Sequence, residues 1–158
     1  MADQASFMAQ MPELVPTLTV SDPRASLEWF EKLGFQTVFQ MAKPDGAIMH
    51  AHLARGGAQL MLGPACPDSA AKGMAPGSTG MDLYITLRDE TADALYERAR
   101  AAGITIGEEP RDQFWGDRTF QVRHPDGYRI WFAQHVRDVS PEELHRAAAE
   151  WAATAVKA

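Results

Sequence analysis

The stretch HPDGYRIWF, residues 124–132, contains the pattern that decides the fold. The letters PDG are typical of a tight turn, and the residues after them alternate strictly. Ile130 and Phe132 share one face of a strand, and Arg129 and Trp131 share the other. A large aromatic side chain such as Trp131 on the face opposite Ile130 and Phe132 indicates that this second face is either covered or lines a pocket.

Length, charge and cysteine content restrict the class of protein. A chain of 158 residues fits one domain, or two small modules that share a core. The net charge of −6 argues against nucleic acid and anionic membranes as partners, because both favour basic patches. No apolar run is long enough to span a bilayer, and the first residues lack a signal-peptide pattern. Cys66 is the single cysteine, which suits a reducing cytoplasm.

Two segments of the chain repeat the same order of elements. Residues 15–35 and residues 82–104 each read as an alternating strand, then a helix pattern that stops at a glycine, either Gly34 or Gly103. Each segment is followed by a short strand and then by a predicted hairpin, over residues 48–62 and 119–132. The repeated unit is therefore β-α-β-β-β.

This repeat predicts the domain organisation. We expect a single domain over residues 12–138, made of a first module (12–63), a linker (64–80) rich in Pro, Gly, Ala and Ser, and a second module (81–138). Residues 139–158 form a separate C-terminal helix, which begins with the capping box Ser140-Pro-Glu-Glu143. Trp151 on that helix needs a surface to pack on, either the domain itself or a second subunit.

Alternation divides the strand residues into two faces. The helix-covered face is almost entirely apolar, as a core requires. The opposite face mixes polar and aromatic side chains, which is typical of a small-ligand pocket. The residues assigned to that face are Val15, Thr17, Thr19, His50, His52, Gln59, Met61, Asp82, Tyr84, Thr86, Gln121, Arg123, Arg129 and Trp131.

The motifs LTVSDPRASLEWFEKLGF, YITL, DQFWGDR and HPDGYRIWF, in this order and spacing, resemble the vicinal oxygen chelate superfamily. That superfamily includes glyoxalase, extradiol dioxygenases, fosfomycin resistance enzymes and bleomycin resistance proteins, and the resemblance covers roughly residues 12–138. It implies an α+β fold in which two βαβββ modules form a curved mixed sheet around a cleft. It also implies a homodimer. DQFWGDR resembles the uncharacterised glyoxalase/bleomycin-resistance-like branch.

Metal-dependent members of this superfamily carry four ligands, on the first and last strand of each module. By the resemblance, these positions fall on Val15, Met61, Asp82 and Trp131. Catalytic divalent ions prefer imidazole and carboxylate ligands, so only Asp82 could serve. We therefore expect no metal cofactor. The alternative is an unusual divalent transition-metal site made by His50, His52 and Asp82, since the two histidines share a strand face.

The resulting expectation is a metal-independent binder of a small organic ligand, in the manner of bleomycin-resistance-like proteins. Tyr84, Trp115 and Trp131 would stack on the ligand, and His52, Gln59, Asp82 and Arg118 would orient it, with His50 and Met61 also lining the pocket. No catalytic residue is identified. The alternatives are a metal-dependent glyoxalase-like lyase or isomerase and a purely structural fold with a filled cleft.

Two of these assignments have competing interpretations. Trp115 either closes over a ligand or plugs the open end of the sheet. Arg118 either clamps an acidic group of the ligand or pairs with Asp117 or Asp112.

Overall fold

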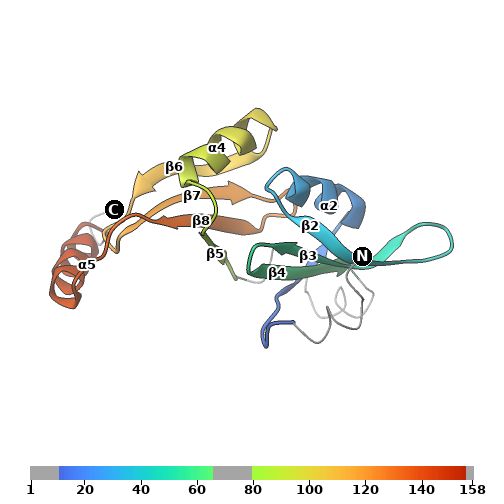
Figure 1. The fold of residues 1–158 in the computed structure, drawn as a ribbon, viewed down its shortest axis with the longest axis horizontal. Coiled ribbons are helices and arrows are strands. Elements are labelled where there is room, and N and C mark those ends of the chain that lie inside the picture. The colour runs from blue at the N-terminus through green and yellow to red at the C-terminus, as the bar shows by residue number, and fades with distance from the viewer. Residues whose placement is uncertain (1–10, 66–79, 156–158) are drawn as a thin grey trace.

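The computed structural model describes residues 11–65 and 80–155 and contains two βαβββ modules and a C-terminal helix (Figure 1). The first module consists of β1 (Thr17–Val20), α2 (Pro23–Glu31), β2 (Gln36–Ala42), β3 (Ile48–Arg55) and β4 (Ala58–Pro64). The second consists of β5 (Leu83–Leu87), α4 (Ala92–Ala101), β6 (Thr105–Asp112), β7 (Asp117–Arg123) and β8 (Arg129–His135). Helix α5 spans Pro141–Ala155. The predicted α+β class and module order are confirmed.

Each module forms its own four-stranded mixed sheet. The strand orders are β1-β4-β3-β2 and β5-β8-β7-β6, so β1 and β5 occupy equivalent edges of the two sheets. β1 and β5 run parallel to their neighbours, β4 and β8, and all the other strand pairs are antiparallel. Residues 66–79, which make up most of the predicted linker, lie outside the described residues.

Local sequence signals explain where the two module helices begin and end. Asp22 caps α2 by accepting a hydrogen bond from the backbone N–H of Ala25, and Thr91 caps α4 by accepting one from Ala94. Beyond the C-terminal ends, Gly34 has φ of 85° and Gly103 has φ of 76°. Glycine adopts this left-handed conformation without steric cost, which is why both helix patterns stop there.

The core lies between each helix and the face of the sheet that it covers. In Figure 1, α2 and α4 lie along the same side of the molecule, above their sheets. The rings of Phe120 and Phe132 stack with centroids 5.4 Å apart, and Phe30 and Phe35 meet edge to face at 5.3 Å. These four side chains are fully buried, as the sequence pattern predicts for the helix-covered face.

A buried histidine joins the two modules. The turn between β7 and β8 places His124, only 3% exposed, against α2 of the first module. Its Nδ1 accepts a hydrogen bond from the backbone N–H of Asp126 at 3.0 Å. Its Nε2 therefore carries the proton and donates to Ser26 Oγ at 3.0 Å, while the ring of Trp29 packs edge to face on the imidazole at 4.9 Å. Burial lowers the pKa of His124.

Two further hydrogen-bonded contacts fix the same turn to the start of α2. The carboxylate of Asp126 accepts hydrogen bonds from the backbone N–H of Ser21 at 3.0 Å and from its hydroxyl at 2.6 Å. The phenol of Tyr128, which is almost fully buried, donates to the backbone carbonyl of Thr19 at 2.7 Å. The PDG turn thus both closes a hairpin and attaches the second module to the first.

The equivalent turn of the first module attaches to the start of α4. Arg55, at the end of β3, donates through Nε to the carbonyl of Leu33 at 3.0 Å and forms an ion pair with Glu90. Glu90 is also bound by Arg98 of α4, and Asp89 lies 3.5 Å from Arg55. We call these contacts and those around His124 the module joint. They hold the modules through turns and helix starts, and the two sheets remain separate.

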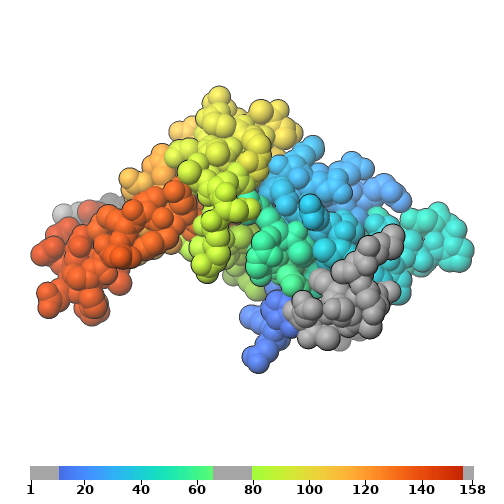
Figure 2. Space-filling view, in the orientation of Figure 1, coloured from blue at the N-terminus to red at the C-terminus, as the bar shows by residue number. Residues whose placement is uncertain are grey.

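Helix α5 stands off from the body at one end of the molecule (Figure 2). The backbone N–H of Glu143 donates to Ser140 Oγ at 3.2 Å, which confirms the predicted cap. Trp151 is 60% exposed and has the ring of Phe114 as its aromatic neighbour at 6.4 Å. In the part of the chain that the structure describes, no helix is long and apolar enough to cross a membrane.

We predict that Gly116→Ala destabilises the fold strongly. Gly116 has φ of 101°, and a Cβ added there would lie 2.2 Å from the backbone oxygen of Arg137. The clash involves backbone and adds to the cost of a left-handed alanine, so the free energy of unfolding should fall by at least about 2 kcal/mol. Urea unfolding measures this change in the free energy of unfolding. Gly57→Ala is the matched control, because Gly57 has no left-handed φ and no atom within 4 Å of its added Cβ, so its stability should be unchanged. Equal stability of the two variants would contradict this assignment.

We predict that the module joint weakens in mild acid through His124. Its folded-state pKa lies below the ordinary value, so the unfolded chain takes up a proton at pH values where the folded chain keeps the ring neutral. The stabilisation is therefore complete above a pH of about 6.5 and is lost as the pH falls through the folded-state pKa. In chemical unfolding, the stability advantage of the wild type over His124→Asn should shrink between neutral pH and mild acid. A stability difference between the wild type and His124→Asn that stays constant or grows in mild acid would contradict this role of His124.

Candidate ligand-binding face

The face of the second sheet that α4 does not cover brings together four of the predicted site residues, Asp82, Tyr84, Trp115 and Trp131. Tyr84 on β5 lies opposite Trp131 on β8, and Trp131 lies opposite Gln121 on β7. Asp82, just before β5, accepts a hydrogen bond from the indole Nε1–H of Trp131 at 3.2 Å. This register places Trp131 at the centre of the face, half-buried between its neighbours. We call this surface the open face.

Asp82 fixes the orientation of the indole. One carboxylate oxygen accepts from Trp131, and the other accepts from Arg129 Nε at 2.7 Å. A carboxylate with a hydrogen bond at each oxygen has part of its acceptor capacity already used. The role of Asp82 in this geometry is therefore to hold the Trp131 ring and the Arg129 guanidinium in fixed positions.

A second hydrogen-bonded network orders the other aromatic residues of the open face. The phenol of Tyr84 donates to Asp117 at 2.7 Å and accepts from Trp115 Nε1 at 3.1 Å. Asp117 also contacts His135 Nδ1 at 3.2 Å. Burial is the larger cause and the hydrogen bond to Asp117 the second, and together they raise the pKa of Tyr84 to about 12. The phenol is therefore protonated at neutral pH. The predicted residues Tyr84 and Trp115 thus contact each other, and the indole of Trp115 is bonded to a side chain of β5.

Two polar side chains are buried beneath this surface. Thr119 Oγ1 accepts a hydrogen bond from Gln113 at 2.7 Å. Gln121 is 2% exposed, and its Oε1 has no hydrogen-bond partner in the structure. A Cβ added to Gly107 on the neighbouring strand would lie 2.3 Å from that oxygen, so Gly107 provides the space that Gln121 occupies.

The first sheet holds four of the other predicted pocket residues, His50, His52, Gln59 and Met61. His52 lies opposite Met61, as the turn at Gly56 and Gly57 predicts. Its Nε2–H donates to Gln59 Oε1 at 3.0 Å, and burial lowers the pKa of His52, so its ring is neutral at neutral pH. His50 is half-buried beside the ring of Phe39. These residues belong to a different sheet from Trp131 and Asp82.

Arg118 lies on the helix-covered side of the second sheet. It shares the alternation of Phe120 and binds Asp93 of α4 through Nε at 2.7 Å and Nη2 at 2.9 Å. Nη1 donates to Asp112 at 2.9 Å, so the predicted pairing with Asp112 is present. These two carboxylates raise the pKa of Arg118. The structure does not bring Arg118 to the open face.

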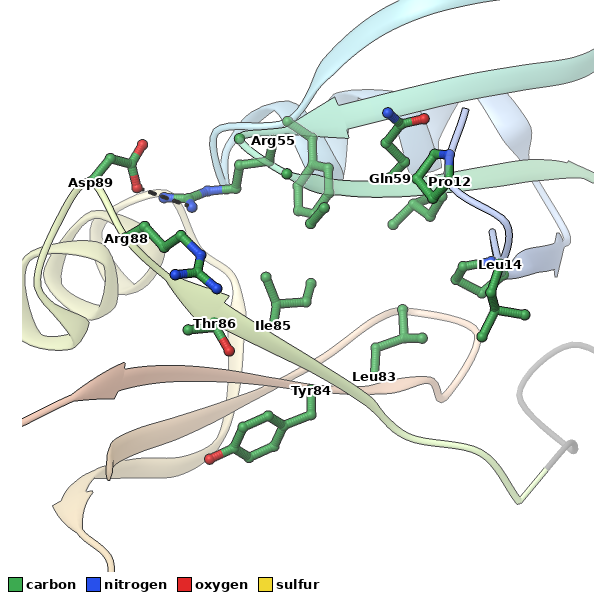
Figure 3. Close-up of a pocket in the computed structure, with 16 residues that line it drawn as sticks. Pro12, Leu14, Arg55, Gln59, Leu83, Tyr84, Ile85, Thr86, Arg88 and Asp89 are labelled. Carbon is green, nitrogen blue, oxygen red and sulfur yellow. Dashed lines mark hydrogen bonds and ion pairs between the residues drawn. The ribbon is translucent and has the colours of Figure 1, made fainter. Parts of the chain in front are cut away.

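A cavity of about 520 Å³ lies between the modules (Figure 3). Leu83 and Ile85 point into it from β5, whereas Tyr84 points from the opposite side of that strand. Gln59 and Tyr84 are the predicted residues among its lining. Sequence reasoning missed its other walls, which include Leu14, Arg55 and Arg88, because a wall built from two modules depends on how the modules are placed.

The superfamily metal positions do not fit a divalent cation in one chain. Val15 precedes β1, Met61 is on the first sheet, and Asp82 and Trp131 bond to each other on the second. Within residues 11–65 and 80–155, no group of three or more His, Cys, Asp or Glu side chains is arranged to hold a metal ion. The alternative set of His50, His52 and Asp82 is divided between the two sheets in the same way.

Comparison with known proteins agrees with this fold. Residues 12–132 match the Glyoxalase/Bleomycin resistance protein/Dioxygenase superfamily. An uncharacterised protein of Mycobacterium bovis is 34% identical over 142 residues, covering 86% of this chain and 91% of the relative. Among solved structures, TioX from Micromonospora sp. ML1 superposes with a TM-score of 0.63 and 26% identity, covering 80% of this chain and all of TioX. A bleomycin-binding protein complexed with bleomycin superposes with a TM-score of 0.58 and 23% identity, covering 78% of this chain and 98% of that protein.

The chain therefore belongs to the glyoxalase/bleomycin resistance protein/dioxygenase superfamily, as the sequence motifs indicated. Within it, this chain carries Val, Met, Asp and Trp where the resemblance places the four metal ligands.

Proposed function

We propose that this protein binds a small planar organic molecule on the open face, with Trp131 as the stacking surface and no metal ion. The observation that carries the proposal is the hydrogen bond from Trp131 Nε1 to Asp82, which holds a half-exposed indole in one orientation. A preoriented aromatic ring loses little conformational freedom when a ligand stacks on it. A ligand-binding protein of this fold is known, since a structural neighbour is a bleomycin-binding protein complexed with bleomycin.

The groups beside Trp131 favour binding over catalysis. Tyr84 holds its proton more tightly than an ordinary tyrosine, because its pKa is raised to about 12. The carboxylates of Asp82 and Asp117 are each engaged by two side chains. A general base must be free to accept a proton from the substrate. These groups instead serve to position aromatic side chains.

We further propose that a second copy of the chain completes the cleft. β1 and β5 are edge strands, and each pairs on one side only within the described residues. Leu14, Met81 and Tyr84, which lie near these edges, are exposed apolar or aromatic side chains. Pairing between subunits would cover them and bring the Met61 face of one chain opposite the Trp131 face of the other. We propose that this dimer acts in the cytoplasm, which the single cysteine suits.

The binding proposal predicts that 2-naphthamide, an uncharged planar probe, binds and that Trp131→Ala abolishes detectable binding. Loss of a stacking aromatic removes one to a few kcal/mol of binding free energy, about a tenfold weakening or more. Ligand-detected NMR titration measures the affinity for 2-naphthamide. Trp151→Ala is the matched control, since Trp151 lies on α5, outside the sheet that carries Trp131, and its removal should leave binding unchanged. Absence of binding to the wild type, or equal loss in both variants, would overturn the proposal.

The dimer proposal predicts complementation between two inactive variants. Met61→Glu and Trp131→Ala would each spoil every cleft of its own homodimer. After subunit exchange, the mixed dimers would contain one cleft with both mutations and one with neither. Random exchange should restore about a quarter of the wild-type binding capacity for 2-naphthamide, because half of the dimers are mixed and each has one intact cleft. If the mixture binds no more than the separate variants, the cleft is not shared between subunits.

A further inference from the structure

We propose that the ligand carries an anionic group, which Arg123 and Arg129 bind at the edge of the open face beside Trp131. This inference rests on the proposed function and adds the chemical class of the ligand, a planar molecule with a carboxylate or a similar anion. It comes from the pairing of charges on the second sheet, and stacking on Trp131 does not involve these charges.

Two arginines lie directly opposite each other in this sheet. Arg123 ends β7 and Arg129 begins β8, and the two are partners in the antiparallel register. Like charges in that arrangement repel and destabilise a sheet. An unfavourable local arrangement of this kind is typical of a functional position, where a bound counter-charge compensates for it.

The protein supplies one carboxylate to this pair. Asp82 binds Arg129 through Nε at 2.7 Å and uses its other oxygen for Trp131. Among the described residues, Arg123 has neither a hydrogen-bond nor an ion-pair partner. The cluster of Arg123, Arg129 and Asp82 therefore has a net charge of +1 in a chain whose overall net charge is −6.

The free donors face a hollow. Arg123, Arg129 and Asp82 line a depression of about 290 Å³, together with Met81, Gly80 and Gly127. The side chain of Arg129 is 48% exposed, and its two terminal nitrogens have no partner among the described residues. A guanidinium with these nitrogens free presents parallel N–H groups that match the two oxygens of a carboxylate.

Asp82 also fixes the distance between the charged and aromatic parts of the site. Because its two oxygens bind Arg129 and Trp131, the guanidinium and the indole edge are separated by one carboxylate. A single small molecule can therefore place a flat ring on Trp131 and an anionic substituent at the arginines. Bidentate recognition would also make the anion a determinant of specificity, since an uncharged analogue leaves the arginine pair uncompensated.

The test compares 2-naphthoate with 2-naphthamide, which share the ring system and differ in charge. The wild type should bind 2-naphthoate about tenfold more tightly, and Arg123→Gln should remove most of that preference while leaving the affinity for 2-naphthamide within about twofold. Arg146→Gln removes the same charge from the exposed side of α5 and should leave both affinities unchanged. The wild-type preference should also decrease as salt is added, because salt screens exposed charges. That measurement needs no variant.

Equal affinity of the wild type for the two probes would overturn the anion inference. An equal loss for both probes in Arg123→Gln, or the same loss of preference in Arg146→Gln, would overturn it as well. In each of these cases, binding of 2-naphthamide that requires Trp131 would leave the proposed function intact. If neither probe binds, the proposed function fails and this inference fails with it.

Discussion

The module joint is the constraint on which the rest of the structure depends. A turn from each module attaches to the helix start of the other, through the buried His124 on one side and the buried Arg55 on the other. Neither contact involves pairing between strands of different modules, so the two sheets keep their edge strands and their uncovered faces. The joint therefore holds the two sheets in one chain without pairing one sheet with the other. Everything proposed about ligand and partner uses surfaces that this arrangement leaves available.

Other residues occupy the positions at which the family resemblance places metal ligands. A divalent ion would orient a ligand by direct coordination. In this chain the corresponding positions of the second module hold Asp82 and Trp131, which bond to each other. We propose that a fixed aromatic ring and the arginine N–H groups beside it provide the orientation instead. The proposed use of stacking and ion pairing in place of coordination fits recognition as the main activity of the open face.

Sequence reasoning predicted the modules well, because strand alternation and helix stops are local signals. It placed the helix stops at Gly34 and Gly103, where both glycines adopt a positive φ. Arg118 was wrongly expected in the pocket, because strand alternation was not used to assign its face. Its alternation with Phe120 already places it on the helix-covered side, where it binds Asp93.

The rest of the site could not be predicted from local pattern. Neither the burial of His124 against Trp29 nor the inter-module cavity has a sequence signal, because both depend on how two separately folded units are placed. The same holds for the pairing of Asp82 with Trp131, since the two residues lie far apart in the chain and meet through the parallel register of β5 and β8. Alternation identified which side chains share the open face, and tertiary packing decided which of them touch.

The most direct test is the indole region of a nitrogen–proton NMR spectrum during titration with 2-naphthamide. The chain has 4 tryptophans, and each contributes one indole N–H signal. The account predicts that the Trp131 signal, assigned from its absence in Trp131→Ala, shifts most, with a smaller shift for Trp115. Trp29 in the module joint and Trp151 on α5 should stay unchanged. A largest shift at Trp29 or Trp151 would contradict the assignment of the open face as the ligand site.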